Sequence, residues 1–208
     1  MTDAEKARRE LAYAFKNCRQ VTSGQHAGRD AIDVVIEIAR QYREQECSDF
    51  FEGTTLVPVP TSGVGVDKPG DDLWSGRELA ERLASEFEAQ WCPALVRHTA
   101  VSKSSNSGSR SLERHLQSIR LDQLPETRTV ILVDDHVTTG ATMCACAQLL
   151  WDAVPGLVVA GYAVAYVPSP AETSFFDFAT RLYEWTGTLD KPQNTLVAAG
   201  RLRPQPCR

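Results

Sequence analysis

The segment at residues 130–142 constrains the fold more than any other part of the chain. It reads Val-Ile-Leu-Val-Asp-Asp-His-Val-Thr-Thr-Gly-Ala-Thr. Residues 129–133 form a continuous β-branched and apolar run, which predicts a strand buried on both faces. Two carboxylates follow, and hydroxyls and a glycine then lead into a helix expected over 140–154. This strand is one of several that alternate with helices, which implies a parallel α/β sheet with its sites at the carboxyl ends of strands.

Apolar residues at helical spacing predict two helices near the N-terminus. The first begins with a capping box formed by Thr2 and Glu5. The second follows Asp30, which stands at the N-cap position. We therefore expect residues 1–53 to form a helical N-terminal extension or hood, and residues 54–208 to form the core.

The remaining elements follow in alternation. A short apolar run, Leu-Val-Pro-Val-Pro, begins after Thr55 and predicts a strand ended by prolines. Further elements are expected at 73–87 (helix, with Ser75 as a candidate cap), 94–98 (strand), 111–119 (helix) and 158–167 (buried strand). The serine-rich stretch 102–109 lies between them and is expected to be mobile.

The start of the helix after residue 139 is suited to bind a phosphate. The amides of the first turn and the helix dipole favour an anion, and the threonine hydroxyls add donors. Gly140 lets the backbone close around the phosphate without a Cβ in the way. We expect five residues to contact a 5′-phosphate: Thr138, Thr139, Gly140, Ala141 and Thr142.

The two carboxylates suggest that the phosphate belongs to a sugar. Asp134 and Asp135 can accept hydrogen bonds from vicinal ribose hydroxyls one sugar-length away. An ordinary strand-to-helix turn capped by threonines is the alternative interpretation. Other phosphate motifs fit worse, because the chain has neither G-x-x-x-x-G-K-[ST] nor G-x-G-x-x-G.

Residues 130–142 resemble the binding motif for 5-phosphoribosyl 1-diphosphate (PRPP) of the type I phosphoribosyltransferases. The resemblance implies that family's α/β fold, a parallel-sheet core with a variable hood. A wider and weaker match over 56–166 resembles the ComF-like branch, with Val-Pro-Val-Pro at 57–60 as its first core strand. The paired-cysteine zinc ribbon of that branch is absent here. Its basic loop is mostly acidic in this chain, with Asp67, Asp71 and Asp72 against Lys68.

The resemblance also assigns residues outside the motif. The turn Thr61-Ser62-Gly63 should bind the diphosphate, and its small residues and amides suit that role. Lys103 and Arg110 resemble the basic residues of the family's closing loop, which would act on the leaving diphosphate as catalytic groups. Mg²⁺ is implied as the counterion of the diphosphate, with no metal ligand assigned in the chain.

The resemblance implies transfer of the phosphoribosyl group from PRPP to a nitrogen acceptor, with release of diphosphate. The alternative is a non-catalytic PRPP-sensing or accessory protein. The purine-salvage branch has a carboxylate at the position of Thr138, so ordinary purine salvage is not favoured. We expect His136 to be a partly packed histidine rather than a catalytic base. The acceptor is not specified by the sequence.

The composition excludes several other classes. The net charge is -5, with basic residues scattered, so no duplex nucleic acid partner is predicted. The longest apolar run, 157–167, is too short to cross a bilayer as a helix, and residues 1–10 lack the apolar core of a signal peptide. Six cysteines form no C-x-x-C pair. We expect a soluble, cytoplasmic protein with no membrane partner, whose assembly into a homo-oligomer is left open.

Overall fold

The computed structural model describes residues 3–17, 19–46, 50–61, 74–101, 112–138, 140–166, 183–185 and 194–196. Its helices are α1 (Asp3–Lys16), α2 (Ala31–Glu46), α3 (Ser75–Glu86), α4 (Leu112–Ser118) and α5 (Ala141–Ala153), with a 3-10 turn η1 (Gly24–His26). Its strands are β1 (Thr55–Pro58), β2 (Gln90–Trp91), β3 (Leu95–Arg97), β4 (Ile119–Leu121), β5 (Thr129–Val137), β6 (Val158–Tyr166), β7 (Tyr183–Trp185) and β8 (Asn194–Leu196).

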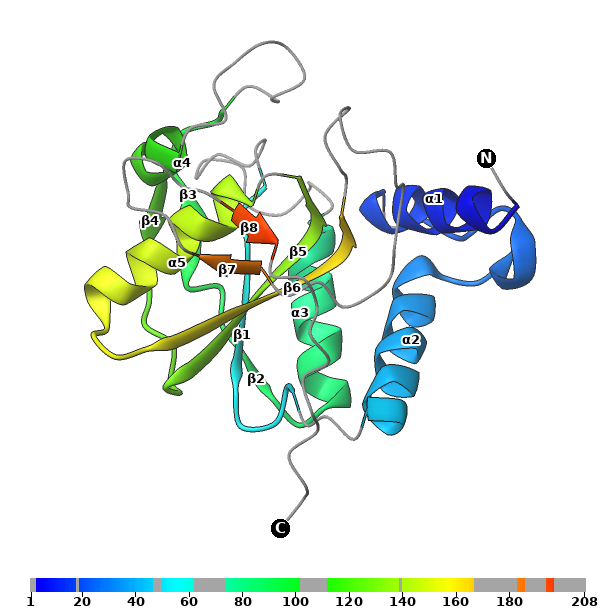
Figure 1. Cartoon of the computed structure of the whole chain (residues 1–208), viewed down its shortest axis with the longest axis horizontal. Coiled ribbons are helices and arrows are strands. Elements are labelled where there is room, and N and C mark those ends of the chain that lie inside the picture. The colour runs from blue at the N-terminus through cyan, green and yellow to red at the C-terminus, as the bar shows by residue number, and fades with distance from the viewer. Residues whose placement is uncertain are drawn as a thin grey trace.

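Four parallel strands form the main sheet, in the order β2-β1-β5-β6 (Figure 1). The register pairs Pro58, the last residue of β1, with Val133 of β5. β5 continues alongside β6 as far as Val137. It therefore carries residues 134–137 past the point where β1 stops. The parallel α/β fold predicted from the sequence is confirmed.

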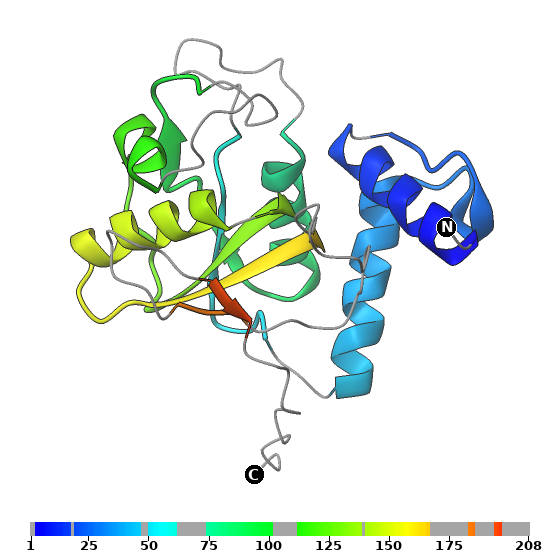
Figure 2. The same cartoon turned by 45° about the horizontal axis from the view of Figure 1, so that its top comes forward.

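The central strands β1 and β5 are buried on both faces, and their successive side chains point to opposite sides of the sheet. Leu56 and Ile131 pack with α1, α2 and α3 on one face. Val57 and Val130 pack with α5 and with β3 and β4 on the other face. The helices accordingly lie in two layers around the sheet (Figure 2). Both faces exclude water, which explains the unbroken apolar run that predicted β5.

The N-terminal helices pack against the sheet. Phe15 of α1 and Ile32 of α2 are fully buried and belong to the same apolar cluster as Ile131. The predicted N-cap of α2 is confirmed, because Oδ1 of Asp30 accepts a hydrogen bond from the amide of Ile32 at 2.8 Å. Together these contacts fix the start of α2 and bury the apolar stripes of α1 and α2.

Some local predictions were wrong. Ser75 is the first residue of α3 rather than its cap, since Trp74 occupies the N-cap position. The strand expected at 94–98 is the shorter β3, which pairs antiparallel with β4 in a small second sheet. β2 was not predicted, because a strand of two residues has no periodic pattern. β7 and β8 form another antiparallel pair.

Candidate functional site

The carboxyl ends of β1 and β5 lie at a switch point of the sheet. The chain passes from β1 through α3 to β2 on one side, and from β5 through α5 to β6 on the other. α3 and α5 pack on opposite faces. In open α/β sheets, ligands bind at such a point, outside the carboxyl ends of the strands. Thr61 follows β1 at this edge, and Asp134 and Asp135 lie at the same edge near the end of β5.

Asp134 and Asp135 each accept a hydrogen bond from the next amide. The amide of Asp135 donates to Oδ1 of Asp134 at 2.8 Å, and the amide of His136 donates to Oδ1 of Asp135 at 2.7 Å. Oδ2 of Asp135 lies 3.5 Å from the hydroxyl of Ser75 and 3.4 Å from Nδ1 of His136. Both carboxylates keep oxygen lone pairs that can accept further hydrogen bonds. His136 is half-buried, as a partly packed histidine should be.

The two carboxyl groups differ in acidity. Burial raises the pKa of Asp134 well above its ordinary value, and the negative charge of Asp135 raises it further. Burial also acts on Asp135, but the hydrogen bond and charge of His136, with the hydrogen bond to Asp134, lower its pKa to about 2. Asp135 is therefore an anion at neutral pH, whereas Asp134 binds a proton more readily.

Helix α1 supplies a cation to this edge. α1 contacts β5, and the end of α1 that carries Lys16 lies beside the carboxyl ends of β5 and β6 (Figures 1 and 2). The charge of Lys16 lowers the pKa of both Asp134 and Asp135, although it is a smaller influence than burial. The N-terminal helices thus contribute to the electrostatics of the site.

The turn after β5 has a backbone that only glycine adopts readily. Gly140 precedes α5 with a φ of 76°, in the left-handed region. α5 begins at the next residue, so the positive end of its dipole faces the turn. Thr142 is half-buried in the first turn of α5, and Thr138 is exposed at the end of β5. The predicted phosphate-binding residues that the structure describes are therefore together at this turn.

His115 of α4 also lies at the turn, although the sequence did not single it out. Its Nε2 is 3.3 Å from the hydroxyl of Thr142. Within the described part of the chain, its buried Nδ1 has no hydrogen-bond partner. Burial, assisted by the charges of Arg97 and Arg114, lowers the pKa of His115 to about 4. The ring is thus neutral at physiological pH, and two cations act on the region around the start of α5.

Of the predicted diphosphate turn, the structure describes Thr61. Its carbonyl accepts a hydrogen bond from Nε of Arg97 at 2.7 Å. The indole of Trp74 donates to the carbonyl of Val59 at 3.2 Å, which ties the start of α3 to the end of β1. The other predicted site residues lie outside the described part of the chain: Ser62, Gly63, Lys103, Arg110 and Thr139.

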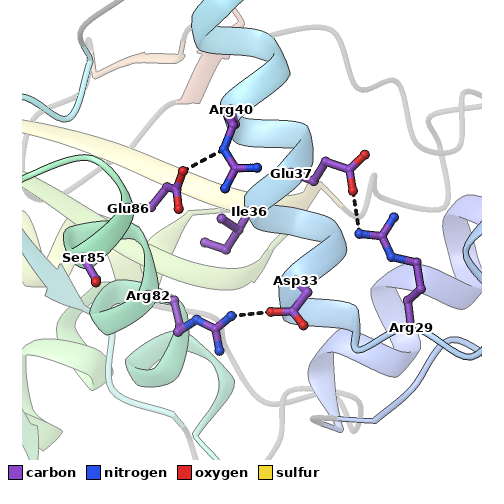
Figure 3. Close-up of a pocket in the computed structure, with 8 residues that line it drawn as sticks. All are labelled: Arg29, Asp33, Ile36, Glu37, Arg40, Arg82, Ser85 and Glu86. Carbon is purple, nitrogen blue, oxygen red and sulfur yellow. Dashed lines mark hydrogen bonds and ion pairs between the residues drawn. The ribbon is translucent and has the colours of Figure 1, made fainter.

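A hollow of about 370 Å³ lies away from this edge, between α2 and α3 (Figure 3). Its charged lining residues form three ion pairs: Arg29 with Glu37, Arg40 with Glu86, and Arg82 with Asp33. Solvent screens exposed pairs of this kind, so they contribute little to stability. Because these charges pair with one another, we interpret the hollow as part of the packing between α2 and α3. We place no ligand there.

The fold and this edge define an α/β protein with a candidate ligand site at the carboxyl ends of β1 and β5. Residues 73–174 match the family model described as the phosphoribosyl transferase domain. The match includes α3, β5, the Gly140 turn and α5. Residues 73–174 are therefore a phosphoribosyltransferase domain, and the fold is the type I fold that the sequence predicted. The chain's place in the ComF-like branch stays a prediction.

A comparison with curated proteins finds no match. Among the residues that the structure describes, no helix is both long and apolar enough to cross a bilayer.

Proposed function

We propose that the chain binds PRPP with Mg²⁺ and transfers the phosphoribosyl group to a nitrogen nucleophile, releasing diphosphate. The position of Asp134 and Asp135 at the carboxyl end of β5, just before the Gly140 turn, is the observation that supports this most strongly. The match of residues 73–174 to the phosphoribosyl transferase domain supports phosphoribosyl transfer as the class of reaction.

In the proposed complex, one extended ligand spans β1 and β5. The 5′-phosphate meets the start of α5, where the helix dipole and the hydroxyl of Thr142 favour an anion. The ribose hydroxyls donate to Asp134 and Asp135. The diphosphate meets the turn that begins at Thr61. β1 and β5 are neighbours in the sheet, so these three parts of the ligand would lie along a single edge.

The proposed site suits Mg²⁺. This ion prefers oxygen ligands, keeps several waters, and usually binds through one or two carboxylates together with substrate phosphates. Asp134 and Asp135 could provide carboxylate oxygens beside the proposed diphosphate. Within the described ranges, no group of three or more His, Cys, Asp or Glu side chains could hold a metal ion. We propose that the cation enters with the diphosphate and offsets charge on the leaving oxygens.

In the reaction itself, the bond from ribose C1 to diphosphate breaks as a bond to the acceptor nitrogen forms. Positive charge develops on the ribose in an oxocarbenium-like transition state. Asp135, an anion at neutral pH, can stabilise that charge through its contact with the ring hydroxyls. The rest of the protein positions the two reactants, which lowers the entropic part of the barrier.

A PRPP-sensing regulatory protein is the second candidate. The acidic residues Asp67, Asp71 and Asp72 favour it, because they replace the basic loop of the ComF-like branch. Such a protein would bind PRPP at the same edge and release no diphosphate.

Calorimetric titration with PRPP and Mg²⁺ tests the proposed ligand. Changing Asp134 and Asp135 together to Asn keeps their shape and removes the charged acceptors, so PRPP binding should weaken by about 1–3 kcal/mol. Asp152→Asn is the matched control, since Asp152 is an exposed carboxylate near the far end of α5. Absence of PRPP binding to the wild-type chain, or equal binding by wild type and the double variant, would contradict the proposal.

A further inference from the structure

Arg97, the last residue of β3, is a buried arginine at the edge of the candidate site. Only 3% of its surface is exposed. Its Nε donates to the carbonyl of Thr61 at 2.7 Å, and its Nη2 donates to the carbonyl of Pro60 at 3.4 Å. One guanidinium thereby holds two consecutive carbonyls of the segment that leaves β1.

The same guanidinium is tied to α4. Its Nη1 donates to the hydroxyl of Ser118, which in turn donates to the carbonyl of His115 at 3.2 Å. The ring of His115 contacts Thr142 in the first turn of α5. Arg97 is therefore part of a chain of polar contacts that runs from the turn after β1 to the start of α5.

The charge of Arg97 is compensated only from a distance, by the charge of Asp134. Within the part of the chain that the structure describes, no carboxylate forms an ion pair with it. Burial lowers the pKa of Arg97, yet arginine stays protonated in proteins, so the positive charge persists. A buried cation that meets only neutral oxygens is costly to the folded state. An anion bound at the adjoining turn would reduce that cost.

The contacts with carbonyl oxygens also have a directional effect. A peptide unit is planar and trans, so fixing a carbonyl in one direction fixes the following N–H in the opposite direction. By holding the carbonyl of Pro60 on its own side, Arg97 sets the direction of the N–H group of Thr61.

We propose that Arg97 is a positioning residue for the diphosphate end of the ligand, which it orients by holding the backbone at Pro60 and Thr61, where the chain leaves β1. This inference rests on the proposed function, because it assumes that the diphosphate binds beside Thr61. Ser118 is the residue that holds the guanidinium in place.

Two simple ligands test the two ends of the site separately. Ribose 5-phosphate carries the sugar and the 5′-phosphate but no diphosphate, whereas inorganic diphosphate with Mg²⁺ carries no sugar. We would measure both dissociation constants by calorimetry for the full-length wild type, Arg97→Met and Arg97→Lys. Arg97→Met should weaken diphosphate binding on the order of tenfold and change ribose 5-phosphate binding by less than about twofold. Arg97→Lys keeps the charge without the planar fork, so it should restore only part of the loss.

Arg120→Met is the matched control. Arg120 is exposed on the neighbouring strand β4 and pairs with Asp122 at 3.6 Å. Ser118→Ala gives a second test if Arg97→Met does not fold, because it removes one contact of the guanidinium and should produce a smaller loss of diphosphate binding alone. Equal weakening of both ligands, or unchanged diphosphate binding in the folded variants, would overturn the role of Arg97. If the wild-type chain binds neither compound, the proposed function itself fails.

Discussion

Nε2 of His115 lies 3.3 Å from the hydroxyl of Thr142, so an uncharged imidazole from α4 contacts the first turn of α5. Burial and two nearby cations lower the pKa of His115 from 6.5 to about 4. Between these two values the unfolded chain binds a proton that the folded chain does not. The free energy of unfolding should therefore decrease as the pH falls from 6.5 to about 4, with no further loss from this group below that range.

Urea unfolding of the wild type and His115→Gln, from about pH 7 to about pH 4, measures this contribution. The variant has no titrating ring, so the difference between the two curves reports His115 alone. We expect the wild type to lose on the order of 1–3 kcal/mol relative to the variant across this range. Parallel curves would show that His115 is not the group responsible.

The two carboxylates of β5 should respond differently to neutralisation. Burial and the charge of Asp135 raise the pKa of Asp134, so ionised Asp134 destabilises the folded state above its ordinary pKa of 3.8. Asp134→Asn should then leave the thermal midpoint unchanged or raise it, while PRPP binding weakens. Asp135→Asn should lower both the thermal midpoint and the affinity for PRPP, because the low pKa of Asp135 reflects a stabilising interaction with His136.

Thermal unfolding and calorimetry at neutral pH, with Asp152→Asn as the surface control, check this pair of variants. A stability loss in Asp134→Asn as large as that in Asp135→Asn would contradict the assignment of the raised pKa to Asp134. Stability that improves while binding weakens is the expected sign of a residue retained for a ligand.

The sequence predicted the parts of this protein whose signals are local. The run at 129–133 indicates β5 because a strand buried on both faces is apolar throughout. Asp134, Asp135 and Gly140 are contiguous with that run, so the acidic strand end and the glycine turn could be predicted together. A two-residue strand such as β2 is too short to produce a pattern.

Arg97 and His115 could not be predicted as site residues. Arg97 comes close to Thr61 only because β3 pairs with β4 and packs beside β1. His115 contacts Thr142 only because α4 packs on α5. Such contacts join residues far apart in the chain, and no periodicity or short motif records them.

Gly161 of β6 makes room for a side chain of α5. A Cβ at Gly161 would lie 2.4 Å from the sulfur of Met143, too close for an ordinary contact. Because Gly161 is exposed and the methionine side chain is flexible, Gly161→Ala should destabilise the protein by about 1 kcal/mol, the lower end of the range for overpacking. Truncating Met143 should remove the clash, so Met143→Ala should cost less in the Gly161→Ala background than in the wild type.

A double-mutant cycle by urea unfolding measures the coupling between Gly161 and Met143. We expect the double variant to lose less free energy of unfolding than the sum of the two single losses. Additive losses would mean that the side chain of Met143 moves aside at no cost.

Two basic residues at the margins of the serine-rich stretch, Lys103 and Arg110, provide a test that distinguishes an enzyme from a PRPP sensor, although both lie outside the described residues. Cations on a closing loop would act mainly on the charge that builds up on the departing diphosphate. They should therefore contribute more in the transition state than in the ground state. Changing both to Ala should lower kcat on the order of tenfold or more and affect PRPP affinity much less.

Three proteins are compared: the wild type, the double variant Lys103→Ala with Arg110→Ala, and a control in which the exposed Arg120 and Arg128 are both changed to Ala. Each is incubated with PRPP, Mg²⁺ and a panel of nucleobases and amines, and diphosphate release is measured. Diphosphate release that depends on the acceptor and falls only in the first double variant, while PRPP still binds, supports catalysis by this loop. Equal release by all three proteins would refute the role of the two cations. PRPP binding with no release for any acceptor favours the sensor, because a protein that only binds PRPP has no transition state for these cations to stabilise.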